Sequence, residues 1–224
     1  MSTIVIANCN KVLGDIQNEL ATKYNAEIIN ENDDLTLEKL ELIQPDYVFF
    51  LHWSWIISEA VYKRFNCVVF HMTDLPFGRG GSPLQNLLIR GLKETKISAL
   101  KVDKGIDTGD IYMKRGLNLN GTAQEIFIRS GNIIKEMIAD IIANDPVPTM
   151  QVGEPVYFKR RTPSESLITG ELSRIPALYD FIRMLDAENY PNAFIENEHF
   201  KFEFTGAEII NEKELRANVR IIKK

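Results

Sequence analysis

Two histidines stand directly after apolar segments of the chain, and each could take part in proton transfer. His52 follows YVFFL at residues 47–51, and His71 follows CVVF at residues 67–70. Imidazole is the side chain that most readily exchanges protons near neutral pH. Both positions are typical of the carboxyl end of a buried strand, where open α/β sheets bind their ligands. The third histidine, His199, lies in the polar stretch NEHF, and we expect it at the surface.

The residues that follow His71 favour it over His52 as a functional residue. The run FHMTDLPFGRGGSPLQ combines a strand end, a turn shaped by proline and a glycine-rich loop that carries Arg79. A helix is predicted to begin near Pro83, since proline suits the first helical position. Such a loop can bring backbone N–H groups and a cation close to a ligand.

A second cluster of polar residues follows in DKGIDTGD, where three carboxylates surround two glycines. They are Asp103, Asp107 and Asp110. A carboxylate beside an imidazole can set the protonation state of the ring and take up a proton. We expect no metal here, because Asp107 and Asp110 lack a convincing third and fourth ligand.

Short apolar segments alternate with amphipathic ones in the part of the chain that precedes His71. Strands are predicted at residues 3–7, 26–29, 47–51 and 67–70, and helices at 15–24, 37–43 and 58–65. This alternation predicts an α/β fold with a doubly wound, mostly parallel, Rossmann-like sheet and helices on both faces.

The remainder of the chain predicts a continuation of this domain and a smaller module. Strands are predicted at residues 96–102 and 109–114, and a long helix at 122–143 with a capping box of Thr122 and Glu125. Several prolines and a glycine between residues 146 and 155 indicate a linker. We therefore expect an N-terminal catalytic domain at residues 1–155 and a small, mainly β module at 156–224.

Composition limits the classes of partner. The chain has 224 residues, 45% of them hydrophobic, and 26 Lys and Arg against 31 Asp and Glu, for a net charge of −5. Residues 156–224 carry 11 residues of each sign, so the acidity lies in the rest of the chain. Such a balance does not favour nucleic acid. Cys9 and Cys67 stand in apolar runs as expected of buried thiols, and the absence of a signal peptide or membrane span predicts a cytoplasmic protein without a membrane partner.

The stretch that begins at His71, together with the later DTGD loop, resembles the folate-dependent formyltransferase family. In that family a strand-end histidine opens an HPSLLPxxRG type of stretch, and a DxG-type loop follows. His71, Leu75-Pro76 and Arg79-Gly80 match the stretch, and Asp107 stands where the family has its catalytic aspartate. The resemblance implies a formyltransferase fold, catalytic roles for His71 and Asp107, and N10-formyltetrahydrofolate as the co-substrate.

The resemblance also implies which residues bind the pterin ring of that co-substrate. Its edge would be read by backbone groups of two short segments, namely Trp55, Ile57, Asp103, Lys104, Gly105 and Ile106. The role of Trp53 and Trp55 stays open between core packing, a ligand and a partner chain. Alternation along an extended segment places both rings on one side.

The segments FKRRTPSES and YDFIRMLDAENYPNAF look most like the short bacterial sugar-nucleotide N-formyltransferases of the pseudaminic-acid type. This likeness implies formylation of the 4-amino group of a nucleotide-linked deoxyamino sugar, UDP-4-amino-4,6-dideoxy-L-AltNAc, in cell-surface glycan biosynthesis. A UDP-linked sugar is favoured over a dTDP-linked one. Phosphates need cations or backbone N–H donors. The expected substrate-binding residues are Arg79, Gly80, Gly81, Ser82, Lys159 and Arg160.

One departure from the family pattern leaves alternatives open. The family has asparagine two positions before the histidine, where it helps to hold the formyl oxygen, and this chain has Val69. Ser54, Thr73 and Gln85 are candidates to replace it. The first alternative function is a methionyl-tRNA formyltransferase, which the short, neutral tail disfavours; the second is a non-catalytic folate-binding relative. A homodimer also stays open, because Phe200, Phe202 and Phe204 share one face of a predicted strand.

Overall fold

The computed structural model describes residues 2–224, which form two compact units. Unit 1 comprises the residues up to Gly80, Thr95–Leu117 and Phe127–Tyr157, and unit 2 comprises Gly81–Glu94, Asn118–Ile126 and Phe158–Lys224. Each unit is therefore assembled from separate stretches of the chain. The division at residues 155 and 156 remains a prediction about domains.

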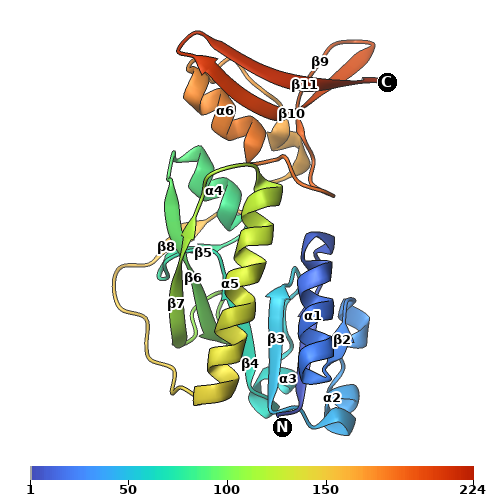
Figure 1. The fold of residues 1–224 in the computed structure, drawn as a ribbon, viewed down its shortest axis with the longest axis vertical. Helices are drawn as coiled ribbons and strands as arrows, with labels where there is room; N and C mark the ends of the chain where they lie inside the picture. Colours follow the sequence, from blue (N-terminus) through green and yellow to red (C-terminus); the bar gives the residue numbers. More distant parts are fainter. Residues whose placement is uncertain (1) are drawn as a thin grey trace. The chain divides into compact units, whose positions relative to one another are not determined.

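A mostly parallel sheet forms the centre of unit 1 (Figure 1). Its strands, in spatial order, are β2 (Glu27–Ile29), β1 (Ile4–Asn8), β3 (Tyr47–His52), β4 (Cys67–His71), β6 (Glu94–Lys101) and β7 (Ile111–Asn118). Neighbouring strands from β2 to β4 are parallel, and β6 is antiparallel to β4. The predicted α/β fold with a mostly parallel sheet is confirmed.

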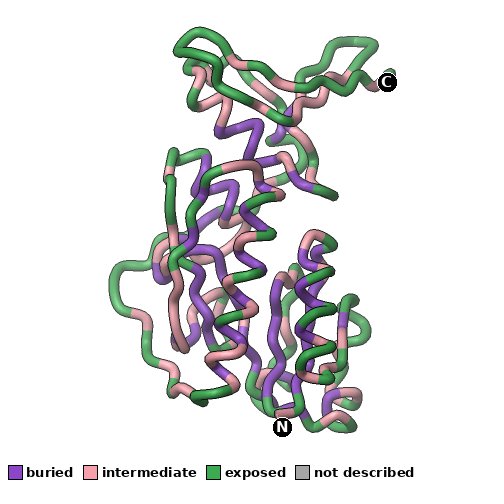
Figure 2. Tube along the Cα trace, in the orientation of Figure 1, coloured by how far each residue is buried: buried purple, intermediate pink, exposed green. Residues whose placement is uncertain are grey.

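Helices cover both faces of this sheet. They are α1 (Gly14–Tyr24), α2 (Leu37–Ile43), α3 (Glu59–Arg64) and α5 (Ala123–Asn144). Val5 and Phe50 pack in one cluster with Leu40 of α2 and Val61 of α3. On the other face α1 and α5 lie side by side (Figure 1). Figure 2 shows the central strands as buried along their length, which explains why their sequences are nearly continuous apolar runs.

The antiparallel position of β6 follows from how the chain leaves β4. A short helix at Pro83–Ile89 lies in the connection that follows His71, but the chain does not cross back to the end of the sheet where β4 begins. Instead β6 begins at the edge where β4 ends, so that Ser98 pairs with His71. Sequence periodicity marks a strand but does not give its direction, so the antiparallel pairing of β6 with β4 is a finding of the structure.

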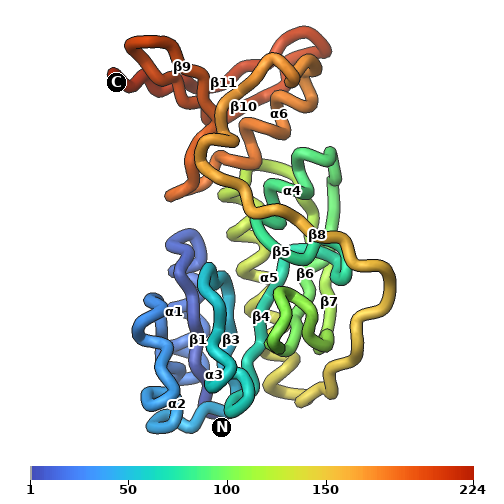
Figure 3. The backbone as a smooth tube through the Cα atoms, turned by 180° about the vertical axis from the view of Figure 1, so that it is seen from behind, coloured from blue at the N-terminus to red at the C-terminus, as the bar shows by residue number. Residues whose placement is uncertain are grey.

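The segment after β4 contains a short strand that sequence did not predict. β5 (Phe77–Gly80) pairs with β8 (Val156–Phe158) in a two-stranded ribbon, best seen from behind (Figure 3). The Val156 N–H donates to the carbonyl of Pro76 at 3.2 Å. The glycine-rich sequence FGRG has no strand periodicity, so only this pairing defines it as a strand.

Unit 2 contains an antiparallel sheet in the order β11-β10-β9. Its elements are α4 (Pro83–Ile89), α6 (Ile175–Arg183), β9 (Ala193–Glu196), β10 (Phe200–Asn211) and β11 (Glu214–Lys223). Phe202 pairs with Ile221 on one side and Ile195 on the other. The predicted β module at the C-terminal end is confirmed, with α6 as an addition.

Short 3-10 helices complete the list of elements, at Lys11–Leu13, Asn32–Asp34 and Pro163–Ser166. The predicted capping box of α5 is present, because the Thr122 N–H donates to Glu125 at 2.8 Å and the Glu125 N–H donates to the Thr122 hydroxyl at 3.3 Å. Within residues 2–224, no helix has both the length and the apolar character needed to cross a membrane.

Candidate active site

The structure brings His71 and Asp107 together from two separate elements of unit 1. His71 is the last residue of β4, and Asp107 lies in the loop that joins β6 to β7. Nδ1 of His71 lies 3.5 Å from Oδ2 of Asp107, and the two side chains are only 8% and 14% exposed. Their charges therefore interact with little screening by water.

The other ring nitrogen of His71 defines the orientation of the imidazole. Nε2 lies 2.7 Å from the carbonyl oxygen of Gly78. Because a carbonyl can only accept a hydrogen bond, Nε2 carries a proton and donates it. Nδ1 is thus the nitrogen that faces Asp107, and the contact becomes an ion pair when Nδ1 is also protonated.

The Asp107 carboxylate has a second partner in the glycine-rich loop. The Gly80 N–H donates to Oδ2 of Asp107 at 2.8 Å. Asp107 itself has a φ of 54°, in the left-handed region that few residues other than glycine adopt. Within the same loop, Asp103 accepts from the Gly105 N–H at 2.9 Å and from the Thr108 hydroxyl at 2.5 Å. The loop is therefore shaped by its own polar side chains.

Buried polar contacts also hold the segment that contains Gly78. The Ser98 hydroxyl of β6 donates to the carbonyl of Thr73 at 2.7 Å and accepts from the Leu75 N–H at 3.3 Å. Gly78 has a φ of 80° and Gly80 a φ of 103°, so both positions favour glycine. These contacts place the Gly78 carbonyl against His71.

Arg79 donates to protein groups with all three guanidinium nitrogens. Its Nε and Nη2 donate to the side-chain oxygen of Gln151 at 3.2 and 2.8 Å, and Nη1 donates to the Tyr157 hydroxyl at 3.3 Å. Arg79 thus ties β5 to β8 and to the segment before it. Its predicted contact with a phosphate stays a prediction.

Of the other predicted substrate-binding residues, Gly80 belongs to unit 1, and Gly81, Ser82, Lys159 and Arg160 belong to unit 2. The Gly81 N–H donates to the Phe158 carbonyl at 3.2 Å, and a Cβ on Gly81 would lie 2.6 Å from the Cα of Arg160. The Ser82 hydroxyl accepts from the Arg161 N–H at 3.0 Å. The GGS segment and the KRR segment that contains Lys159 are therefore neighbours, as a shared cation-rich site requires.

The residues predicted to bind the pterin belong to two segments, which follow β3 and β6 of unit 1. Trp53, Ile57 and Val102 pack against the same core cluster, so the segments after β3 and β6 lie close together. Hydrogen bonding and charge from Lys63 lower the pKa of Glu59, and the charge of Lys104 adds to this effect. Lys104 is thus near the start of α3, which follows the first segment.

Each of these two segments has an exposed apolar side chain. Trp55 is 40% exposed and Ile106 is 66% exposed, so both offer apolar surface to a ligand. Gly105 lies between Lys104 and Ile106 in a tight turn, where a Cβ would lie 2.1 Å from the Thr108 hydroxyl oxygen. Trp53 instead packs edge-on against Phe50 in the core, with ring centres 5.6 Å apart.

The candidates to replace the family asparagine differ in their surroundings. Thr73 is fully buried, and its hydroxyl donates to the Gly78 carbonyl at 3.4 Å. Gln85 lies in unit 2, where it donates to the Met184 carbonyl at 3.2 Å. Ser54 is exposed and lies 3.5 Å from the thiol of Cys9. Val69 itself packs against Leu75 and Leu100 in the core, and the replacement stays a prediction.

Sequence reasoning missed two residues that shape this site. Gln151 lies in the segment interpreted as a linker, and nothing in the pattern of that segment marks it. The Gly78 carbonyl is a backbone group, so its identity as the partner of His71 has no counterpart among side-chain motifs. The sequence shows only that Gly78 and His71 are close enough along the chain for a tight turn to bring them together.

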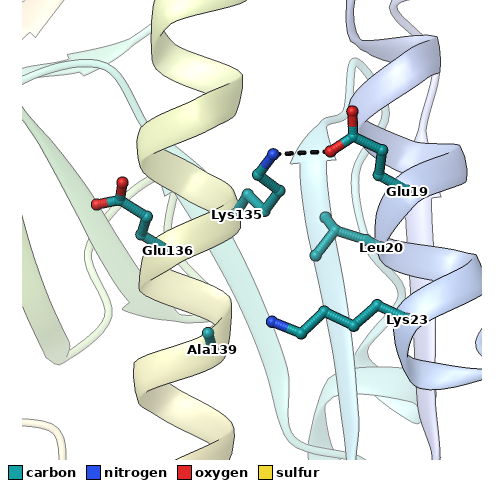
Figure 4. A pocket seen from close by; sticks show the side chains of 6 residues that line it. All are labelled: Glu19, Leu20, Lys23, Lys135, Glu136 and Ala139. Atoms are coloured by element: carbon teal, nitrogen blue, oxygen red, sulfur yellow. Dashed lines mark hydrogen bonds and ion pairs between the residues drawn. The ribbon is translucent and has the colours of Figure 1, made fainter.

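A cavity of about 330 Å³ lies elsewhere in unit 1, between α1 and α5 (Figure 4). It is lined by Glu19, Leu20, Lys23, Lys135, Glu136 and Ala139. Lys135 and Glu19 form an ion pair across it at 2.7 Å. It shares no residue with the site around His71.

The site so far consists of a mostly parallel α/β sheet that presents a buried histidine–carboxylate pair, an arrangement suited to proton transfer. A family model described as "Formyl transferase" matches residues 4–125, which is more than half of the chain. A second model, described as "Methionyl-tRNA formyltransferase, C-terminal domain", matches residues 163–222. The chain belongs to the formyl transferase family. The predicted N10-formyltetrahydrofolate-dependent class of enzyme is confirmed at the level of the family.

Individual relatives share different parts of the chain. A solved structure described as methionyl-tRNA formyltransferase from Clostridium thermocellum is 48% identical, covers 100% of both chains and superposes with a TM-score of 0.95. The methionyl-tRNA formyltransferase of Rickettsia felis is 26% identical over 186 residues, 80% of this chain and 60% of the relative. The chain thus spans little more than half the length of such curated relatives. A likely sugar N-formyltransferase from Mycobacterium tuberculosis, with a TM-score of 0.70 over 88% of this chain and 93% of its own, is 16% identical and shares the fold alone.

These comparisons correct the predicted substrate. The prediction of a sugar-nucleotide N-formyltransferase in glycan biosynthesis, with no nucleic-acid partner, is wrong. The C-terminal segment that suggested this substrate matches the model of the methionyl-tRNA formyltransferase C-terminal domain. The solved structure that covers the whole chain is also described as a methionyl-tRNA formyltransferase. RRTP is a motif of only four residues, whereas the match over residues 163–222 uses nearly the whole C-terminal module. The predicted family is therefore confirmed, whereas the predicted branch of the family is wrong.

Proposed function

We propose that this protein formylates the α-amino group of methionine attached to tRNA, with N10-formyltetrahydrofolate as the donor. The observation that carries the proposal is the 48% identity, over the full length of both chains, to the Clostridium thermocellum methionyl-tRNA formyltransferase. The match of residues 163–222 to the C-terminal domain of such enzymes supports it. The predicted cytoplasmic location belongs to the same proposal, because aminoacylated tRNA is made and used there.

The reaction assigns distinct tasks to the residues around His71. The donor supplies a formyl carbon that the amine attacks, so that a C–N bond forms, the bond to N10 breaks, and one proton passes from the amine to N10. Asp107 would accept the proton of the amine, because its Oδ2 is an ionisable oxygen beside His71. His71 would hold a mobile proton at Nδ1, since Nε2 already donates to Gly78. Acid–base catalysis of this kind contributes about 10²–10⁴ in rate.

The chain offers two sets of residues for the two substrates. Trp55, Ile57 and the turn from Asp103 to Ile106 would hold the pterin, with apolar surface from Trp55 and Ile106 and with backbone donors and acceptors at its edge. The exposed cations Lys159 and Arg160 of unit 2 would contact phosphates of the tRNA. The net charge of −5 is compatible with such phosphate contacts, because it sums over the whole chain and does not show local clusters of charge.

The direct test is formyl transfer by the purified chain. N10-formyltetrahydrofolate and methionyl-tRNA are supplied, and formylmethionine is measured after hydrolysis of the ester. We expect formylation of methionyl-tRNA and none of free methionine. Binding of a folate analogue without any turnover would contradict the proposal and identify a non-catalytic relative.

A second measurement addresses the nucleic acid. Affinity for methionyl-tRNA should fall steeply as salt rises, since phosphate contacts release counterions. Removal of both Lys159 and Arg160 should reduce that slope. A variant with a matched exposed pair, Lys223 and Lys224, shows whether the effect is local or a response to net charge. An affinity for tRNA that does not change with salt concentration would contradict phosphate contacts.

A further inference from the structure

We propose that Gln151 is a positioning residue, which holds Asp107 against His71 by binding the backbone on both sides of the Asp107 turn. This inference rests on the proposed function, because it assigns Asp107 and His71 to the reaction. It concerns a side chain that touches neither imidazole nor substrate. Its effect would pass through the backbone of the loop between β6 and β7.

The Gln151 amide uses its complete hydrogen-bonding capacity. Its Nε2 donates to the carbonyl of Asp107 at 2.8 Å and to that of Gly109 at 2.9 Å. Its oxygen accepts from Nε and Nη2 of Arg79. A primary amide has two donor hydrogens and two acceptor positions, and all four are occupied. Two carbonyls can only accept and a guanidinium can only donate, so the orientation of the amide is unambiguous.

These contacts close a ring of interactions around the site. Arg79 is bonded to Gly80, whose N–H donates to the carboxylate of Asp107. The carbonyl of Asp107 accepts from Gln151, which in turn accepts from Arg79. The glycine-rich loop and the DTGD loop are therefore joined at two points. Because the loops are joined at these two points, the Asp107 carboxylate cannot move away from His71 without breaking one of these hydrogen bonds.

The backbone at Asp107 explains why such a support is needed. Its left-handed conformation, with a φ of 54°, costs an ordinary residue of the order of 1 kcal/mol. A loop without added contacts would relax toward commoner conformations, which would redirect the side chain. The flanking residues Met150 and Val152 are strongly exposed, whereas Gln151 is half-buried, so the segment turns this one side chain inward.

Substitutions at Gln151 separate positioning from simple stabilisation. Gln151→Glu keeps the shape and the acceptors for Arg79 but removes both donors to the Asp107 loop. Gln151→Met removes every polar contact. We expect kcat to fall about 10- to 100-fold in both variants, with KM for methionyl-tRNA and for the folate within about threefold of the wild type. A merely structural residue would lower thermal stability and leave kcat of the folded protein unchanged.

A spectroscopic measurement makes the test independent of turnover. The ¹⁵N resonances of the His71 ring are assigned with the His71→Asn variant, which separates them from His52 and His199. In Gln151→Glu the Nδ1 resonance should move toward its value in Asp107→Asn, because the carboxylate no longer faces that nitrogen. The matched control is Gln124→Met, which removes a side-chain contact to the Glu188 N–H at 3.0 Å outside the site and should leave the His71 signals and kcat unchanged.

The outcomes distinguish this inference from the proposed function. Wild-type protein that fails to formylate methionyl-tRNA would overturn the proposed function, while the His71 resonances would still report on the role of Gln151. Active wild-type protein with unchanged kcat and unchanged His71 resonances in Gln151→Glu would overturn the inference alone.

Discussion

Oδ2 of Asp107 lies 3.5 Å from Nδ1 of His71, although the two residues belong to different segments of the chain. The same oxygen accepts the N–H of Gly80, so its direction is set by the backbone of the glycine-rich loop. A carboxylate held in this way is ready to orient an imidazole before any substrate arrives. The unfavourable backbone conformation of Asp107 is stabilised by its hydrogen bonds with Gly80 and Gln151, and not by its contact with His71.

Removing either member of this pair should abolish most of the activity without unfolding the protein. We expect His71→Asn and Asp107→Asn to lower kcat by about 10²–10⁴, since each removes an acid–base group. The melting temperature should change by only a few degrees, because asparagine is similar in size to aspartate and retains an oxygen for Gly80. Steady-state kinetics and thermal denaturation measure the two effects. Asp110→Asn, in the same loop, is the matched control, and near-normal turnover in both test variants would refute the assignment.

Position 109 tolerates no side chain. A Cβ on Gly109 would lie 1.7 Å from the carbonyl oxygen of Lys101, a backbone atom that cannot move aside alone. We expect Gly109→Ala to reduce the free energy of unfolding by about 1–3 kcal/mol or more and to lower kcat, because the Asp107 turn must shift. Gly116→Ala is the control: a Cβ there meets nothing within 4 Å. Urea denaturation of both variants provides the comparison, and equal stability would show that the turn adapts freely.

A buried ion pair supports unit 2. Arg183 is 2% exposed, and its guanidinium donates to Asp180 at 2.7 Å and to the carbonyls of Leu119 and Gly121 at 2.6 and 2.7 Å. Arg183→Met should cost about 3–5 kcal/mol of unfolding free energy, because it leaves Asp180 charged and buried without this partner.

The double variant Arg183→Met with Asp180→Leu tests that explanation. It should recover a substantial part of the loss, since no buried charge remains. Lys93→Met, which removes only the more exposed partner of Asp180, should cost less than about 1 kcal/mol. A double variant that is no more stable than the single one would indicate lost packing instead of an uncompensated charge.

The buried thiol of Cys67 should make stability fall at alkaline pH. Burial raises the pKa of Cys67 to about 12, whereas an exposed thiol titrates near pH 8.5. The folded state therefore keeps a proton that the unfolded state releases in between. Stability is fully present below about pH 8.5 and falls by up to about 1.4 kcal/mol per pH unit as pH rises toward 12.

Chemical denaturation of the wild type and of Cys67→Ala at pH 7.5, 9.0 and 10.0 measures this effect. The variant is expected to be less stable at pH 7.5, because it leaves a small cavity, but to lose less stability between pH 7.5 and 10.0. Parallel pH dependence in the two proteins would mean that other groups, such as Tyr47, whose pKa burial also raises, account for the alkaline loss.

Local pattern and motif spacing were sufficient for much of the fold and for one half of the site. Alternating apolar and amphipathic segments predict strands and helices because burial on two faces requires continuous apolar strands. The Thr122 and Glu125 capping box is a contact between residues three apart, so it is readable from the chain alone. His71 and Asp107 were identified by their motifs and lie together, although their roles stay predictions.

Contacts between distant segments were outside the reach of such patterns. The direction of β6, the strand FGRG and the amide of Gln151 depend on which segments meet, and no periodicity encodes that. Net charge also led to the wrong prediction about nucleic acid, because it sums over the whole chain and does not show where the cations lie.

The amino-acid sequence by itself determined the alternation of elements, the strand-end histidine and the aspartate loop, since each depends on neighbours within a few positions. Only the tertiary structure decided which way the imidazole faces, which backbone groups hold the carboxylate and which side chain supports the loop. These are contacts across dozens of residues, whose formation depends on packing of the whole unit.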